Sequence, residues 1–277
     1  MQVSRRVADD EMMHSVLEMW LCMKVQTFLY EQGLMLPLEV DLTHVWTMLD
    51  VACGSGQWVR DMATWSPDMT IVGVDRQLEM IEQARYLSDI WRPGNTSFLV
   101  GNMYHMTEIE DESFDLVHAR FLAPAVAPQA WPFLLHECMR VCRVGGRFVW
   151  TEASFPTTNS AACQQWWSWM KQAMTRLGNT PDVTPFMARL FSDVNSENNE
   201  RMHQIETVLD MSANAPLHER MYRHIPALLL HTKPFLLKYD VADEQAIDAL
   251  CQQMVLDLYS DTFEATWTLI TMIVEKL

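Results

Sequence analysis

The chain has 277 residues, of which 49% are hydrophobic and 20% charged, which suits one large globular domain with a substantial core. Its formal net charge of −16 argues against nucleic acid or an anionic membrane as the main partner, because phosphate binding requires clustered lysine and arginine. The sequence has no apolar run of the ~20 residues that a membrane span requires. Its first residues lack a signal-peptide core, so we expect a cytoplasmic protein.

The six cysteines include no C-x-x-C pair, a pattern typical of reduced thiols. Cys138 and Cys142 lie one helical turn apart, but a metal site would need more ligands. Core packing is the favoured interpretation of this pair. We therefore predict no metal site.

The first part of the chain is predicted to contain a helix, a strand, a glycine turn and a second helix. Apolar residues recur near every 3.6 positions over residues 10–32, which predicts a helix that stops at Gly33. The apolar run 45–51 predicts a buried strand of the parallel-sheet kind. It leads into Gly54 and Gly56, after which helical spacing resumes. Such a turn forms a nucleotide-type pocket, since bare backbone approaches a ligand closely and a helix N-terminus offers N–H donors.

The stretch from Asp50 to Gly56, with the sequence DVACGSG, resembles motif I of the class I S-adenosylmethionine-dependent methyltransferases, acidic-x-Gly-x-Gly-x-Gly. Ala52 stands at the first glycine of that pattern. A dinucleotide fingerprint would instead need a small residue at the place of Val59. The resemblance implies S-adenosylmethionine as cofactor. It assigns to cofactor binding the residues Asp50, Ala52, Cys53, Gly54 and Gly56.

A second apolar run, residues 70–75, ends in Asp75, 19 positions after Gly56. This is close to the offset of a carboxylate that accepts hydrogen bonds from ribose hydroxyls. An N-cap for the helix that begins near Leu78 is the structural alternative. We favour ribose binding, with Arg76 and Met80 beside the nucleoside.

A third strand is predicted at residues 96–100 and is followed by Asn102 and Met103. In the methyltransferases, an Asp-plus-apolar pair at this place holds the adenine. The resemblance therefore implies that the Asn102 amide accepts from the exocyclic amine and that Met103 covers the ring. A plain turn asparagine is the alternative.

The acid-rich turn before residues 114–121 resembles the approach to the fourth strand of the same family. The resemblance places the residues at the far end of this strand, His118, Ala119, Arg120 and Phe121, beside the cofactor. His118 is a candidate base, because imidazole titrates near neutral pH, although a histidine satisfied within the sheet is an alternative. Arg120 is a candidate partner for the carboxylate of the substrate or of the cofactor.

Residues 131–141 have helical spacing, and a Gly-Gly turn at 145–146 like that of the family leads into a fifth strand that ends at Glu152. Ligands bind at this carboxyl edge in open α/β sheets. Glu152 is therefore a candidate catalytic group that orients a substrate amine or hydroxyl. A merely solvated carboxylate is the alternative.

After Pro156 the alternation of strands and helices stops, and an indole-rich helix follows. In the family, an insertion at this point builds a substrate lid. Indoles suit an apolar or aromatic pocket, while packing against the main domain is the alternative. The residues assigned to substrate are Trp166, Trp167, Trp169 and Met170.

The last part of the chain predicts a sixth strand at 203–211, helices at 217–237 and 242–259, and a closing strand at 263–274. In the family, the closing strand runs antiparallel to the others. The expected fold is a doubly wound, Rossmann-like α/β sheet, mostly parallel with an antiparallel last strand.

We divide the chain into an N-terminal helical segment (1–44), a core that binds the cofactor (45–155), a helical lid (156–202) and a C-terminal completion of the sheet (203–277). The expected activity is methyl transfer to an O, N or C nucleophile of a small apolar or aromatic molecule, by a monomer or a homodimer. A protein that binds S-adenosylmethionine without methyl transfer and an NAD(P)-dependent oxidoreductase are the alternatives.

Overall fold

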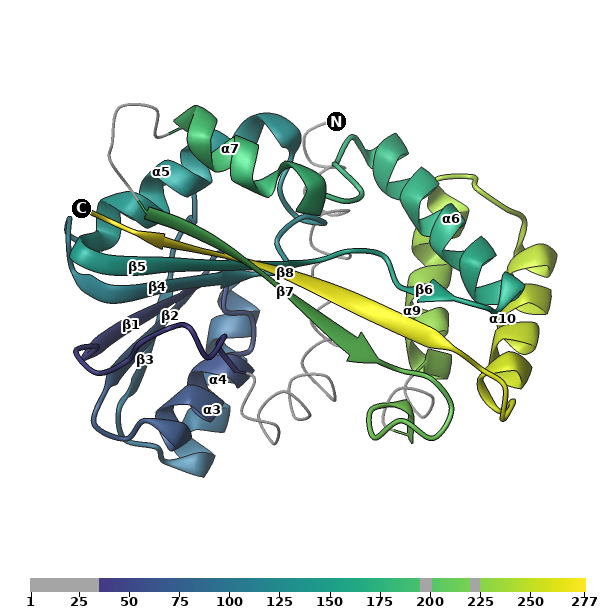
Figure 1. The fold of residues 1–277 in the computed structure, drawn as a ribbon, viewed down its shortest axis with the longest axis horizontal. Coiled ribbons are helices and arrows are strands. Elements are labelled where there is room, and N and C mark those ends of the chain that lie inside the picture. The colour runs from purple at the N-terminus through teal and green to yellow at the C-terminus, as the bar shows by residue number, and fades with distance from the viewer. Residues whose placement is uncertain (1–34, 195–200, 220–224) are drawn as a thin grey trace.

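A computed structural model describes residues 35–194, 201–219 and 225–277, so the predicted helix at 10–32 lies outside the described residues. Its centre is a sheet with the order β3-β2-β1-β4-β5-β8, and β7 forms the edge next to β8 (Figure 1). The short β6 continues the line of β5 along β8. The strands are β1 Thr47–Val51, β2 Thr70–Asp75, β3 Thr96–Val100, β4 Phe114–Arg120, β5 Cys142–Ala153, β6 Thr157–Thr158, β7 Arg201–Asp210 and β8 Ala265–Glu275.

The first five strands are parallel, and β8 pairs antiparallel with β5 on one side and with β7 on the other. Helices cover both faces of the sheet (Figure 1). The described helices are α3 Gln57–Trp65, α4 Leu78–Trp91, α5 Trp131–Val141, α6 Ala161–Leu177, α7 Met187–Val194, α9 Ile225–Lys238 and α10 Glu244–Leu258, with short 3₁₀ turns at Pro128–Ala130 and Thr184–Phe186. The expected doubly wound sheet with an antiparallel last strand is confirmed.

Strand β1 is buried on both faces. Its side chains alternate between the two faces, and helices cover each of them. Met48 packs with residues of α3 and α4, whereas Leu49 and Val51 pack with residues of α5 and α7. All three are at most 1% exposed. The near-continuous apolar run in the sequence therefore reflects a central strand between two helical layers.

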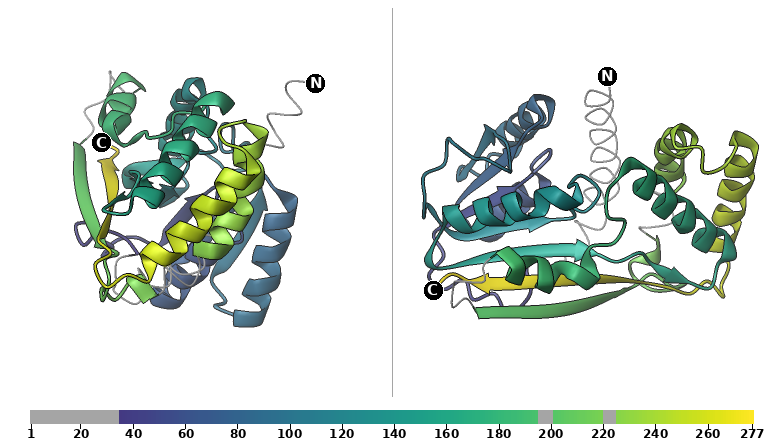
Figure 2. Two further views of the ribbon diagram at one scale, coloured as in Figure 1. Left: turned by 90° about the vertical axis from the view of Figure 1, so that its right-hand side faces the viewer. Right: turned by 90° about the horizontal axis from the view of Figure 1, so that it is seen from above.

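The helices α6, α9 and α10 form a separate group beyond the end at which β8 begins (Figures 1 and 2). The start of β8, from Ala265 to Leu269, packs with this group, and its continuation from Ile270 packs with the main sheet. The segment 156–202, predicted as one lid, is thus split. Its helix α6 joins α9 and α10, whereas Met187 and Phe191 of α7 join the core around α5.

Among the helices that the structure describes, none combines the length and the apolar character that a bilayer crossing requires. Within the same residues, no three histidine, cysteine, aspartate or glutamate side chains are grouped to hold a metal ion.

Candidate functional site

The turn after β1 contains three residues with a left-handed backbone conformation. Ala52, Gly54 and Gly56 have left-handed φ values of 56°, 54° and 72°. A Cβ atom at Gly56 would lie 2.4 Å from Cε1 of Phe98, so both the conformation and the packing require glycine there. Ala52 adopts a conformation that costs a non-glycine residue ~1–2 kcal/mol. Ala52 stands where the family motif has a glycine, which agrees with this left-handed conformation.

Asp75 ties the glycine turn to the next strand. Its Oδ2 accepts a hydrogen bond from the Gly54 amide at 3.0 Å, and its Oδ1 accepts from the Gln77 amide at 2.9 Å. Gln77 is the N-cap residue of α4, so the carboxylate does not cap the first turn of that helix. A carboxylate has about four lone-pair sites and can therefore accept more than two hydrogen bonds.

A cleft beside this turn brings together several of the predicted cofactor residues. It holds about 340 Å³ of empty space, open solvent included, and is lined by Ala52, Asp75, Arg76, Gly101, Met103 and Ala125. Gly101 and Ala125 were not predicted. Met80 and Asn102 do not belong to this lining. Oδ1 of the exposed Asn102 accepts from the Tyr104 amide at 3.0 Å, as in a plain asparagine turn.

Asp50 and His118 lie opposite each other on β1 and β4 and pair inside the sheet. His118 Nδ1 is 2.8 Å from Oδ1 of Asp50, and its ring stacks on Trp58 of α3 with a centroid distance of 3.8 Å. His118 is 2% exposed, and this burial holds the pKa of its imidazole below the ordinary value. The geometry therefore favours a histidine satisfied within the sheet over a base, and it turns the Asp50 carboxylate toward His118 rather than toward the cleft.

Five other predicted cofactor residues do not line the cleft: Cys53, Gly54, Gly56, Ala119 and Arg120. Cys53 is 8% exposed, and its Sγ approaches the Gly54 carbonyl oxygen at 3.6 Å. Ala119 is fully buried in the core around α5. The guanidinium carbon of Arg120 lies 5.6 Å from the ring centroid of Phe121, at the carboxyl end of β4.

Glu152 is buried at the carboxyl end of β5, with 1% of its surface exposed. It accepts hydrogen bonds from the Leu122 amide and from Nε1 of Trp150, both at 2.8 Å, and from the Ala123 amide at 3.3 Å. Burial raises the pKa of Glu152 to about 7, against the opposing effect of these three donors. The alternative of a solvated carboxylate is therefore wrong.

Phe121, which the family resemblance places beside the cofactor, arranges two of those donors. It has a left-handed φ of 54°, uncommon for a bulky residue, and this turn directs the next two amides, Leu122 and Ala123, to Glu152. Strained residues of this kind cluster at functional sites. Only the backbone angle shows this role of Phe121, because nothing in its sequence context requires a left-handed turn.

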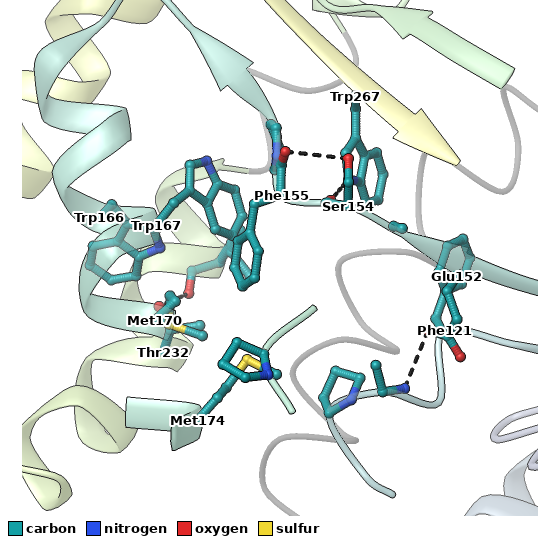
Figure 3. Close-up of a pocket in the computed structure, with 16 residues that line it drawn as sticks. Phe121, Glu152, Ser154, Phe155, Trp166, Trp167, Met170, Met174, Thr232 and Trp267 are labelled. Atoms are coloured by element: carbon teal, nitrogen blue, oxygen red, sulfur yellow. Dashed lines mark hydrogen bonds between the residues drawn. The ribbon is translucent and has the colours of Figure 1, made fainter. Parts of the chain in front are cut away.

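A larger cavity, here called the acceptor cavity, opens beside Glu152 with about 720 Å³ of empty space, open solvent included. Figure 3 shows Phe121 and Glu152 on one side of it and Trp166 and Trp167 on the other. Its lining is mostly apolar, and Glu152 is the one acidic side chain among the described residues that line it. Apolar walls with a few polar groups among them are typical of a small-molecule site.

Three of the four predicted substrate residues line the acceptor cavity. Trp166, Trp167 and Met170 face it from α6, together with Met174, whereas Trp169 is not part of the lining. Trp169 is half-buried and packs against the core that α6 shares with α9 and α10. Lining residues from α9 and β8, Leu228, Thr232 and Trp267, were not predicted, because their helical or strand spacing does not say which face meets a cavity.

The cleft and the acceptor cavity lie at one edge of the sheet because β1, β2, β4 and β5 are parallel. Asp75 ends β2, Phe121 follows β4 and Glu152 lies near the end of β5. The loop after β4 joins the two spaces, since Ala123 lines the acceptor cavity and Ala125 lines the cleft. A ligand in the cleft and a second molecule in the cavity would therefore meet near Glu152.

Residues 48–146 match a family model described as a methyltransferase domain. A demethylmenaquinone methyltransferase of Lactococcus lactis subsp. lactis is 33% identical over 118 residues, which cover 42% of this chain and 45% of that protein. The secondary metabolism regulator laeA of Aspergillus fumigatus is 29% identical over 132 residues, 45% of this chain and 33% of that protein. The matches thus span less than half the length of these relatives.

Solved structures share the fold. A putative methyltransferase from Bacillus halodurans superposes with a TM-score of 0.51 and 14% identity, covering 83% of this chain and 93% of that one. A geranyl diphosphate methyltransferase in complex with S-adenosylmethionine gives a TM-score of 0.50 and 15% identity, covering 91% and 84%. At these identities the likeness is one of fold.

Proposed function

Because residues 48–146 match a methyltransferase-domain model, we propose that this chain belongs to the class I S-adenosylmethionine-dependent methyltransferases and transfers a methyl group to a small apolar or aromatic molecule. The methylated atom is an O, N or C nucleophile. The observation that carries the proposal is Glu152, a buried carboxyl that lies at the cofactor edge of the sheet and faces the apolar acceptor cavity.

The donor set of the cleft fits S-adenosylmethionine, which when bound supplies an electrophilic methyl group on a sulfonium. Asp75 would hold the ribose hydroxyls, since its carboxylate is already oriented by the Gly54 and Gln77 amides. Met103 would cover the adenine, and the bare backbone of the glycine turn would allow close approach of the cofactor.

Glu152 would accept or share the proton of the substrate nucleophile. A carboxyl with a pKa of about 7 is balanced between its two forms near neutral pH, which suits a general base. The Leu122 and Ala123 amides and the Trp150 indole hold the carboxyl in place. The apolar walls would exclude water and align the substrate, an effect that contributes up to ~7–11 kcal/mol to rate acceleration.

Two measurements test this proposal. Isothermal titration with S-adenosylhomocysteine tests the cleft, and transfer of labelled methyl groups to a panel of phenols, enols and amines tests the activity. Glu152→Gln should lower kcat/KM ~10²–10⁴-fold and leave the affinity for S-adenosylhomocysteine unchanged. The control Glu264→Gln changes an exposed carboxylate of the same type and should leave both unchanged. Equal activity of the Glu152→Gln and Glu264→Gln variants would refute the role of Glu152.

A second candidate is a regulator that binds S-adenosylmethionine without methylating a small molecule, because several relatives that match the same domain are secondary metabolism regulators. The acceptor cavity supports the enzyme instead, since an apolar cavity with a buried carboxyl in its wall shares the loop after β4 with the cleft. Tight binding of S-adenosylhomocysteine combined with no transfer to any acceptor would favour the regulator.

A further inference from the structure

A second cavity continues the acceptor cavity on the far side of the two indoles, and we call it the tail cavity. It shares Pro156, Trp166, Trp167 and Leu228 with the acceptor cavity and adds about 530 Å³ of empty space, open solvent included. Its other walls come from the helical group and from the beginning of β8, among them Cys163, Met254, Leu258, Phe263 and Ala265. The two cavities therefore form one path away from Glu152.

The tail cavity is apolar in character. Of its lining, Thr158 and His218 carry clearly polar side chains, and both ring nitrogens of His218 lie near backbone carbonyls, at 2.9 Å from Met211 and 3.0 Å from Leu258. Among the described residues, neither cavity is lined by lysine or arginine. The described walls of this path therefore offer no lysine or arginine to a phosphate or carboxylate group, whereas their apolar surface suits a hydrocarbon chain.

Trp166, which lines both cavities, carries a buried polar atom with no partner among the described residues. Nε1 of Trp166 is buried and has no hydrogen-bond partner within the described part of the chain, and Trp166 lines both cavities. Buried indole N–H groups are normally hydrogen-bonded. A ligand oxygen at this point would satisfy the donor.

We propose that the substrate is a three-part amphiphile. Its protic head lies at Glu152, an oxygen acceptor such as an ester or ketone carbonyl meets Nε1 of Trp166, and an apolar chain fills the tail cavity. That the head is the part methylated rests on the proposed function, whereas binding of the acceptor group and the chain does not. With the nucleoside cleft, this places three spaces in series, joined through the loop after β4 and through Trp166.

The test uses two series of phenols with linear chains of increasing length, alkyl 4-hydroxybenzoates with an ester and 4-alkylphenols without one. Isothermal titration against the full chain should show the dissociation constant falling about fourfold for each methylene until the tail cavity is filled. Trp166→Phe, which keeps an aromatic ring but lacks the N–H, should weaken the ester series about fivefold and leave the alkylphenols unchanged.

Cys163 offers a matched pair of variants in the tail cavity, where it is 5% exposed. Cys163→Leu adds volume and should abolish the gain from long chains while short chains bind as before. Cys163→Ala adds none and should preserve the dependence on chain length. Thermal unfolding of each variant shows whether it folds. If Cys163→Leu does not fold, the two phenol series measured on the unmodified chain test the tail cavity by themselves.

If the affinity of the unmodified protein did not depend on the length of the ligand's alkyl chain, the role of the tail cavity would be refuted. If Trp166→Phe weakened both series equally, the hydrogen bond from Trp166 to the ligand would be refuted. A parallel titration with S-adenosylhomocysteine separates the two levels of inference. If the affinity for the phenols depends on their chain length but S-adenosylhomocysteine does not bind, the amphiphile is supported and the proposed methyl transfer is refuted. If S-adenosylhomocysteine binds and methyl transfer occurs but affinity does not depend on chain length, the proposed function is supported and the amphiphile is refuted.

Discussion

Replacing Glu152 by glutamine should change how the stability of this protein depends on pH. The pKa of Glu152 is about 7 in the folded chain, because burial disfavours the charged carboxylate, against an ordinary value of 4.5. Below pH 4.5 both states carry the proton, and between 4.5 and 7 the unfolded chain loses it first. The folded state then binds more protons, so its stability falls as the pH rises through this window.

The size of the effect follows from the same two values. They differ by about 2.5 pH units, and each unit corresponds to ~1.36 kcal/mol, so the full loss is about 3 kcal/mol. Glutamine does not titrate. The free energy of unfolding of the unmodified chain, relative to that of Glu152→Gln, should therefore decrease by about 2–3 kcal/mol between roughly pH 5 and pH 8.

Urea unfolding followed by circular dichroism at a series of pH values measures this difference. The comparison cancels the titration of the other groups, which the two proteins share. Glu264→Gln, at an exposed position, should show a difference that does not vary with pH. If the difference for Glu152→Gln were also constant from pH 5 to pH 8, Glu152 would titrate as a solvated carboxylate, and the argument from burial would be refuted.

Three further outcomes are expected. Asp75→Ala removes the acceptor of two backbone amides and should weaken S-adenosylhomocysteine binding ~30-fold, about 2 kcal/mol, by isothermal titration; unchanged affinity contradicts its role. Gly56→Ala should destabilise more than Gly94→Ala in urea unfolding, because φ is positive at both (72° and 81°) but only the Cβ at Gly56 meets Phe98; equal losses contradict this. Methyl transfer should rise with pH through about 7, where Glu152 ionises, and a flat rate contradicts a base.

The placement of His118 shows where sequence reasoning reaches its limit. The pattern identified β4 and its carboxyl end, but His118 and Asp50 share the face of the sheet covered by α3, where they pair and meet Trp58. The neighbouring Ala119 packs on the opposite face, in the core around α5. Which face a strand residue takes depends on how the whole strand is paired and covered, and a short sequence motif does not encode it.

For Glu152, sequence reasoning identified the position but not the burial. Its position at the end of a strand could be predicted, but its burial depends on a left-handed turn at Phe121 in another strand–loop connection and on an indole of the same strand. The helical lid divides for a related reason. Periodicity predicts an amphipathic helix such as α6. Its partners, however, are α9 and α10, and α9 begins at Ile225, 48 residues after α6 ends at Leu177.

The sequence by itself determined the local elements and their order: the strand before the glycine turn, Asp75 at the end of the next strand, the Gly-Gly turn and the closing strand. These follow from residue spacing and from backbone conformations that few residue types adopt. Only the tertiary structure decided which carboxyl is buried, which histidine is satisfied and which indoles line a cavity, because burial and facing arise from contacts between segments distant in the chain.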